Sequence, residues 1–296
     1  MVIVDKKKCV GCGTCAKVCH EACISIVEKR ASIDYSTCST CTQCIAICAE
    51  RALSWDGAVP TPFNRDLLPS SNQLGELFGE RRTIRDFTQE PLDRELLEEI
   101  VSQGARAPTH NFHLRYIVIN NPMLIDTFEK ASFQFSSRVY RFLFRPWVVQ
   151  RQVALLSRPI REEFARAKPK LEAAVQRGRG FRSTPAALIC VVGDRRVPLS
   201  VESAQYALYN MSLYAQVKGI GCQNLVGNRM VFNRNRGITD LLGLVKHERF
   251  FAIMGLGYPS IEFKNKVQGK RMQVQWNDGD FHGAVIGKTI GDGNEN

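Results

Sequence analysis

The chain has 296 residues and a formal net charge of +11, from 40 Lys and Arg against 29 Asp and Glu, and this length allows two domains of ordinary size. With 44% hydrophobic and 23% charged residues, its composition is globular and argues against collagen, long disordered tracts and low-complexity fibres. No stretch approaches the ~18 uninterrupted apolar residues that a membrane span needs, and the N-terminus lacks the apolar segment of a signal peptide. We therefore expect a cytoplasmic protein with no membrane span.

The cysteines are concentrated near the N-terminus, because nine of the 11 lie between Cys9 and Cys48. Without a secretion signal, such a cluster favours metal ligation over disulfide bonds. The spacing Cys-x2-Cys-x2-Cys-x3-Cys occurs twice, and each cysteine of the second run follows its counterpart by 29 residues. The two runs therefore indicate an internal duplication. They consist of Cys9, Cys12, Cys15 and Cys19, and of Cys38, Cys41, Cys44 and Cys48.

Each run has the spacing of an iron–sulfur cluster site. Three thiolates on a tight loop can hold three corners of a cubane cluster, while the fourth cysteine begins the next segment and ligates the other cluster. The predicted ligand sets are therefore crossed: Cys9, Cys12, Cys15 and Cys48 for one cluster, and Cys38, Cys41, Cys44 and Cys19 for the other. Zinc is the alternative, but one tetrahedral ion would leave half of these thiols without a role.

With these two runs, residues 1–56 resemble a bacterial-type ferredoxin. The resemblance implies a small domain that carries two 4Fe-4S clusters and accepts one electron at a time. His20 and Ala49 stand where that family usually has proline. Cys23 is a ninth thiol in this region, and we expect it to pack in the core, because its counterpart in the second repeat is the small residue Ala52.

The remaining chain predicts a linker and a second, larger domain. Residues 57–72 hold three Pro, a Gly and two adjacent Ser, which is typical of a linker. A domain is expected over residues 73–282, followed by a polar tail over residues 283–296. Its apolar periodicity predicts a first helix around Leu74 to Phe78, helices over residues 93–101 and 201–218, and buried strands over residues 116–119, 187–192 and 250–254. Both domains together predict an α+β protein.

Four motifs of the second domain carry chemistry. The segment from Arg81 to Arg85 gathers three guanidiniums and a hydroxyl, which suits a phosphate and a negative charge on a ring. The loop over residues 107–111 offers an amide toward a planar heterocycle. Glycines between Gly219 and Gly227 permit close approach of the backbone to a ligand. Gly257-Tyr258-Pro259 is followed by a cationic pair, Lys264 and Lys266.

In this order, the four motifs resemble the nitroreductase family of FMN-dependent enzymes, over roughly residues 72–275. The resemblance implies bound FMN and a homodimer. The flavin-contacting residues that it implies are Arg81, Arg82, Thr83, Arg85, Asn111, Gly227, Lys264 and Lys266. His110 competes with Asn111 for its place, and the candidate proton donors are His110, His113 and Tyr258.

The combination predicts an iron–sulfur flavoprotein oxidoreductase. Single electrons would enter through two 4Fe-4S clusters, accumulate on FMN and leave to an organic acceptor such as a nitroaromatic or an enone. Ferredoxin or flavodoxin is the expected electron donor, with NAD(P)H second. The dinucleotide-binding signature, Gly-x-Gly-x-x-Gly after a strand, does not occur in the sequence. The alternatives are a relay that passes electrons to a protein partner, and a binding protein whose flavin site holds another ligand.

Residues 138–182 carry twelve basic against three acidic side chains, which is most of the net charge. Three interpretations stay open: a lid that recognises an anionic acceptor, a docking surface for an acidic electron carrier, or a solvated helical face. The sequence contains no recognised nucleic-acid-binding module. Cys190 lies in an apolar strand and is expected in the core, while Cys222 is either a buried neutral thiol or a neighbour of the flavin.

Overall fold

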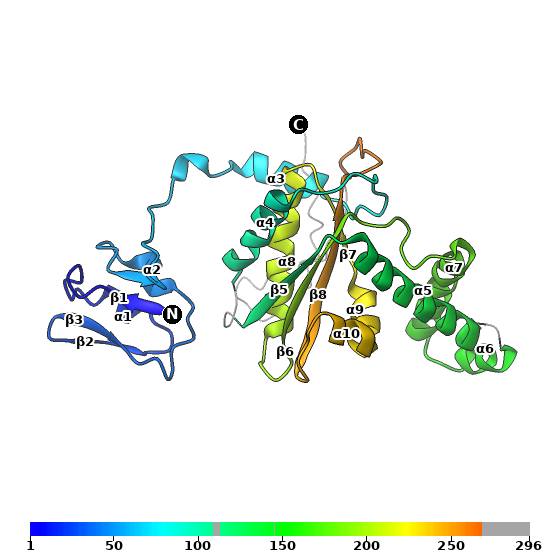
Figure 1. Cartoon of the computed structure of the whole chain (residues 1–296), viewed down its shortest axis with the longest axis horizontal. Coiled ribbons are helices and arrows are strands. Elements are labelled where there is room, and N and C mark those ends of the chain that lie inside the picture. The colour runs from blue at the N-terminus through cyan, green and yellow to red at the C-terminus, as the bar shows by residue number, and fades with distance from the viewer. Residues whose placement is uncertain (109–112, 145, 268–296) are drawn as a thin grey trace, which may run out of the picture. The chain divides into compact units, whose positions relative to one another are not determined.

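The computed structural model describes residues 1–108, 113–144 and 146–267 (Figure 1). The chain divides into two compact units. The first consists of residues 1–68 and 83–260, and the second of residues 69–82 and those from Ile261 onward. No helix in the described part of the chain is both long enough and apolar enough to cross a membrane.

The N-terminal domain is built from two copies of one β-α-β unit. The strands and helices of the first copy are β1 (Val2–Val4), α1 (Thr14–Val18) and β2 (Ile24–Val27), and those of the second are β3 (Arg30–Ile33), α2 (Gln43–Ile47) and β4 (Leu53–Trp55). β1 pairs with β4 and β2 pairs with β3, both antiparallel. Each copy therefore gives one strand to each two-stranded sheet, and every strand pairs with a strand of the other copy.

Cysteines form much of the core of this domain. Cys9, Cys15, Cys23 and Cys44 are buried together with apolar residues of the strands, such as Val2 and Leu53. None of the 11 cysteines, all of which lie in the described part of the chain, forms a disulfide in this structure. Domains this small usually need disulfides or bound metal to supplement a limited hydrophobic core. Thiols therefore occupy part of the core that apolar side chains would otherwise fill.

A four-stranded antiparallel sheet forms the centre of the larger domain. The strands lie in the order β5 (Leu114–Ile119), β6 (Ala187–Asp194), β8 (Glu248–Gly257) and β7 (Gly221–Asn224). Side chains of β6 alternate between two core clusters, one packed on each face of the sheet, because successive residues of a strand point to opposite faces. Both faces of the sheet are thus covered, and the predicted α+β fold is confirmed.

Helices cover both faces of this sheet, as Figure 1 shows. The helices that follow the N-terminal domain are α3 (Ser71–Glu80), α4 (Arg94–Ser102), α5 (Pro122–Phe144), α6 (Trp147–Ala154), α7 (Arg158–Arg177), α8 (Ser200–Val217), α9 (Val226–Arg234) and α10 (Arg236–Leu241). Two short 3-10 helices complete the set: Arg65–Leu67 precedes α3, and Gln103–Arg106 follows α4. The expected linker thus contains a helical turn and the first residues of α3. Gly219 follows α8 with a φ of 75°, as a helix-ending glycine does.

A β-bulge in β8 changes which of its residues point to each face of the sheet. Val191 pairs with Ala252 and Val192 pairs with Phe250, so Phe251 is the extra residue. Phe251 and Ala252 consequently both join the same core cluster. The carbonyl of Phe251 accepts hydrogen bonds from Gln205 and Arg229, each 3.1 Å long. Side chains therefore satisfy the carbonyl at the irregularity.

Part of the basic segment is committed to ion pairs within the fold. Glu129 of α5 is buried and accepts hydrogen bonds from Arg179 Nε at 2.7 Å and Thr184 Oγ1 at 2.8 Å. Arg182 pairs with Asp86 at 2.8 Å. Arg179 and Arg182, at the end of the basic segment, thus form ion pairs with other parts of the domain. These pairs favour a structural role for the two arginines.

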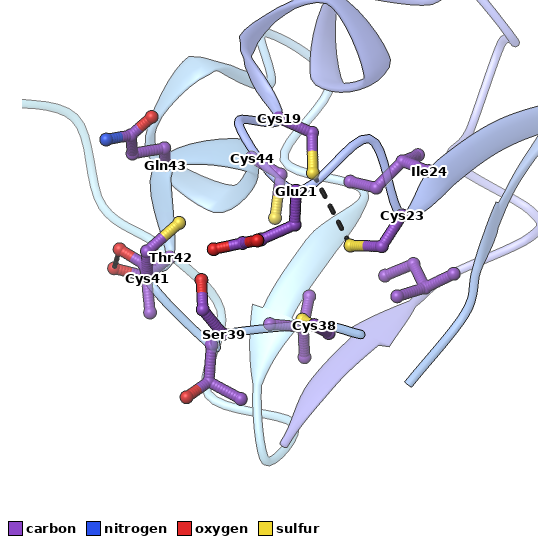
Figure 2. Close-up of a pocket in the computed structure, with 13 residues that line it drawn as sticks. Cys19, Glu21, Cys23, Ile24, Cys38, Ser39, Cys41, Thr42, Gln43 and Cys44 are labelled. Carbon is purple, nitrogen blue, oxygen red and sulfur yellow. Dashed lines mark hydrogen bonds between the residues drawn. The ribbon is translucent and has the colours of Figure 1, made fainter. Parts of the chain in front are cut away.

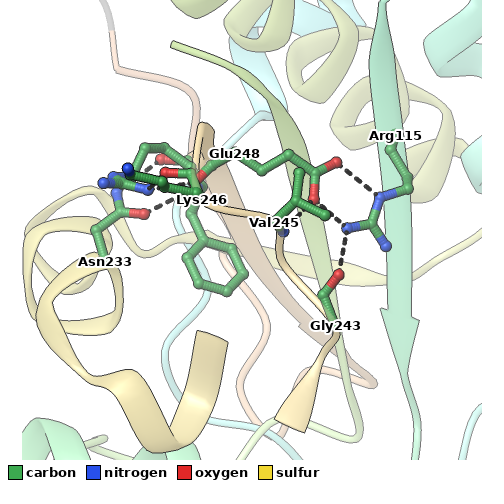
Figure 3. A network of polar contacts seen from close by, with 8 residues as sticks. Arg115, Asn233, Gly243, Val245, Lys246 and Glu248 are labelled. Carbon is green, nitrogen blue, oxygen red and sulfur yellow. Dashed lines mark hydrogen bonds and ion pairs between the residues drawn. The ribbon is translucent and has the colours of Figure 1, made fainter. Parts of the chain in front are cut away.

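A polar network links β5 to the start of β8 (Figure 3). Arg115 of β5 donates to both carboxylate oxygens of Glu248, at 3.1 and 2.7 Å, and the Val245 N–H donates to the same carboxylate at 3.0 Å. The hydrogen bond from Arg115 is the main cause that lowers the pKa of Glu248 below its ordinary value. The network therefore stabilises the fold only while this carboxylate is ionised.

We predict that Arg115→Met lowers the free energy of unfolding by about 0.5–1 kcal/mol at neutral pH, because the guanidinium is partly exposed and screened. The folded pKa of Glu248 lies below the unfolded one, so the contribution is present above the unfolded pKa and is lost as pH falls through the folded pKa. Urea denaturation should show the penalty shrinking as pH falls below the ordinary pKa range of a glutamate. Arg94→Met, at an exposed helical pair, is the control. A penalty for Arg115→Met that does not change with pH would contradict the assignment.

Candidate functional site

The two cysteine loops have the same backbone conformation. Gly13 and Thr42 precede α1 and α2 with left-handed φ values of 78° and 64°. Cys19 and Cys48 end these helices with nearly identical φ and ψ angles, of −74° and 108° and of −75° and 106°. Gly11 is also left-handed, and a Cβ there would lie 2.4 Å from the carbonyl oxygen of Lys29, so only glycine fits. The sequence repeat is therefore a repeat in three dimensions.

Four of the predicted cluster ligands, from both repeats, line one pocket together with Cys23 (Figure 2). Cys19 comes from the first repeat, and Cys38, Cys41 and Cys44 come from the second. They are the second of the two predicted ligand sets. In the described part of the chain, no three His, Cys, Asp or Glu side chains are grouped so that they could hold a single metal ion. The four thiols thus surround a pocket instead of converging on one ion position.

The cysteines of the other predicted set also interact with one another and with the second repeat. Burial raises the pKa of the Cys15 thiol, and the neighbouring Cys9 and Cys12 raise it further. The Ala31 N–H donates to Cys9 Sγ at 3.4 Å, from a strand of the second repeat. The Ala52 N–H donates to Cys48 Sγ at 3.3 Å. Backbone donors aimed at cysteine sulfurs suit thiolates that carry a cluster, because such bonds stabilise negative charge on sulfur.

Burial sets the protonation of the pocket cysteines before any metal binds. It raises the pKa of Cys44 to about 11, with a further contribution from Cys41, and it raises the pKa of Cys23 to about 12. A hydrogen bond with the Thr14 side chain lowers the pKa of the exposed Cys12. Since the thiolate is the metal ligand, assembly of a cluster must release protons from the buried thiols.

Three of the predicted flavin-contacting residues lie around β7, in the first unit. The Ile84 N–H donates to the Cys222 carbonyl at 3.0 Å, which holds Thr83 and Arg85 beside this edge strand. The Ile84 side chain fills the space above Gly221, where a Cβ would lie 2.8 Å from it. Arg85 is exposed. Gly227 lies in the first turn of α9, which begins two residues after β7, and the space beside its Cα is open.

Arg81, Arg82 and Lys266 belong to the second unit and lie along α3. Arg81 ends this helix, and Arg82 Nη1 donates to the carbonyls of Gly79 and Arg81 at 2.7 and 2.8 Å. Lys266 pairs with Glu76 of α3 at 2.6 Å. The other predicted lysine, Lys264, pairs with its neighbour Glu262. The unit therefore gathers three of its four predicted cations on one helix.

The remaining candidates are dispersed or lie outside the described residues. Asn111 and His110 lie outside the described residues. His113 is exposed just before β5, and Tyr258 is half-buried just after β8, where its carbonyl accepts the Thr88 N–H at 2.9 Å. Cys190 is fully buried in β6, as expected, and burial raises its pKa to about 12.

Two features of the sites were missed by the analysis of the sequence. Cys23 is buried as expected, but it also lines the pocket with the four predicted ligands. Its position four residues after Cys19 is the signal that could have indicated this. The N–H donors of Ala31 and Ala52 have no sequence signal, because any residue except proline supplies a backbone N–H.

The model of the nitroreductase family matches residues 79–258, more than half of the chain. One component of an ion-translocating oxidoreductase complex from Methanosarcina acetivorans is 40% identical over 45 residues, and the PorD component of pyruvate synthase from Methanothermobacter marburgensis is 36% identical over 53 residues. These matches cover 15% and 18% of this chain, and 17% and 62% of the relatives. An FMN-bound nitroreductase structure from Bacteroides fragilis is 15% identical, over 69% of this chain and 99% of its own, with a TM-score of 0.49.

The chain belongs to the nitroreductase family, and its larger domain has the α+β fold of that family. Its cysteine-rich N-terminal region is ferredoxin-like. The chain spans less than two-thirds of the length of either curated relative.

Proposed function

We propose that this protein is an iron–sulfur flavoprotein oxidoreductase, which passes single electrons through two 4Fe-4S clusters to FMN and from FMN to an organic acceptor. The observation that carries the proposal is the pocket lined by four cysteines of both repeats, in a chain that belongs to the nitroreductase family. When bound, the clusters would supply one-electron steps and the flavin would supply one- or two-electron chemistry.

The cysteines would hold the clusters in the crossed sets, with Cys48 joining Cys9, Cys12 and Cys15, and Cys19 joining Cys38, Cys41 and Cys44. The pocket supports one of these sets, because Cys19 of the first repeat lines it together with Cys38, Cys41 and Cys44 of the second. N–H donors at Cys9 and Cys48 would stabilise the negative charge on the ligand sulfurs. The chain thus supplies eight thiolates and backbone hydrogen bonds to two of them.

The cations and backbone donors would hold FMN. Arg81, Arg82, Lys264 and Lys266 would bind its phosphate, and Thr83 and Arg85 would contact the edge of the ring, where positive charge stabilises the reduced anionic flavin. The first turn of α9 at Gly227 offers N–H groups that favour an anion. Guanidinium, ammonium and backbone N–H donors are the kinds of group that suit a ligand that is both anionic and planar, and Asn111 would complete the set.

The substrate side of the proposal follows from the same chemistry. The acceptor would be an organic molecule that takes up electron pairs and protons, such as a nitroaromatic or an enone, and the donor would be a reduced ferredoxin or flavodoxin, with NAD(P)H second. His110, His113 and Tyr258 are the candidate proton donors. The protein would act as a homodimer in the cytoplasm.

The crossed ligand sets predict which cysteine substitutions act alike. Replacing any one of the eight by serine should reduce the iron of the anaerobically purified chain from about eight to about four atoms, since one cluster is lost. The cluster that survives in Cys48→Ser should have the same electron paramagnetic resonance spectrum as in Cys15→Ser, and a different one from Cys19→Ser. Cys222→Ala is the control with full iron. A match between Cys48→Ser and Cys44→Ser would instead indicate ligand sets that are not crossed.

Arg85→Ala should weaken FMN binding about ten- to hundredfold, because a hydrogen bond to a charged group contributes about 1.5–3 kcal/mol. The iron content should not change. Fluorescence titration of the apoprotein with FMN measures the dissociation constant, and Arg94→Ala, at an exposed arginine of α4, is the matched control. Equal affinity of Arg85→Ala and the wild type would exclude this arginine from the flavin site.

A further inference from the structure

The pocket that holds the second ligand set contains a fifth cysteine. Cys23 lines it together with Cys19, Cys38, Cys41 and Cys44, and Figure 2 shows the Cys23 and Cys19 sulfurs facing each other. The two Sγ atoms are 3.4 Å apart, within hydrogen-bonding distance for sulfur. Cys23 is only 7% exposed. At the equivalent position of the second repeat the side chain is that of Ala52, so the two cluster sites are not chemically equal.

The two repeats differ in what they offer to the cysteine at the end of each helix. In the second repeat, the Ala52 N–H donates to Cys48 Sγ at 3.3 Å. In the first repeat, the residue four positions after Cys19 is Cys23, and its Sγ lies 3.4 Å from Cys19 Sγ. A cysteine that coordinates a metal is deprotonated and has no hydrogen to donate. The hydrogen shared by the two sulfurs must then belong to Cys23.

The backbone and the surrounding side chains fix this donor in place. The Cys23 carbonyl accepts the Asp34 N–H at 2.8 Å, a bond between the first repeat and the second. Ile24 and Ile33 pair across β2 and β3 and line the same pocket. The thiol is therefore held in a buried apolar wall, where cysteine remains a neutral and unreactive thiol.

We propose that Cys23 is a positioning residue that raises the reduction potential of the cluster held by Cys19, Cys38, Cys41 and Cys44. The inference rests on the proposed function, because it requires a cluster at this site. The S–H of Cys23 donates to the Cys19 sulfur, and a hydrogen bond to a ligand sulfur stabilises the added negative charge of the reduced cluster. The two clusters built from duplicated sequence would thereby differ in the donors to their ligand sulfurs, with the S–H of Cys23 at one and backbone N–H groups at the other.

Two substitutions separate the hydrogen bond from simple packing. Cys23→Ala gives the first repeat the side chain that the second repeat has at this place, so the domain should tolerate it. Cys23→Ser keeps a donor of similar size. The measurement is a redox titration of the full-length anaerobic protein, followed by electron paramagnetic resonance, with iron and sulfide analysis on the same samples. Cys222→Ala removes a thiol of the other domain and is the control.

In Cys23→Ala, we expect the full iron content and a downward shift of one of the two midpoint potentials. The reduction equilibrium should change about tenfold, which is about 59 mV for a one-electron couple. The other midpoint should stay in place, and Cys23→Ser should recover most of the shift. Unchanged midpoints in Cys23→Ala, or equal shifts in both variants, would overturn the inference. Loss of half of the iron would also overturn it, since Cys23 would then be a ligand. Wild-type protein without iron and sulfide would refute the proposed function itself.

Discussion

Strand exchange between the two β-α-β copies is the constraint on which the N-terminal domain depends. β1 pairs with β4 and β2 pairs with β3, so the strands of each copy have their hydrogen-bonding partners in the other copy. The same exchange brings Cys19 to the pocket of Cys38, Cys41 and Cys44. With so many cysteines in a small core, the proposed clusters would couple the folding of this domain to their own assembly.

A second constraint lies in the four-stranded sheet of the larger domain. β6 and β8 are buried on both faces and leave the short strand β7 at the edge. The absence of a side chain at Gly221 lets Ile84 pack on this edge and so fixes the segment that carries Arg85. Thr83 and Arg85 are thereby held beside β7 by packing and one backbone hydrogen bond.

Features that depend on local sequence pattern could be predicted from the sequence, whereas features that depend on pairing between distant segments could not. The spacing of the cysteines, the helices α3, α4 and α8, and the strands β5, β6 and β8 follow from local pattern, and the structure has them. β7 is short and polar, so its pattern resembled a glycine turn, and only its pairing with β8 makes it a strand. The bulge at Phe251 and the contact between Cys19 and Cys23 arise from the alignment of distant segments, which a single sequence does not encode locally. The roles of the flavin-contacting residues remain predictions.

The central claim is that electrons reach the flavin through the clusters. The direct measurement is anaerobic stopped-flow absorbance after mixing with reduced ferredoxin, comparing the wild type with Cys44→Ser, both loaded with FMN. We expect the wild-type clusters to be reduced first and the flavin next. Flavin reduction in Cys44→Ser should be many-fold slower although FMN remains bound. Equal rates of flavin reduction in the two proteins would contradict it, because the flavin would then receive its electrons without the clusters.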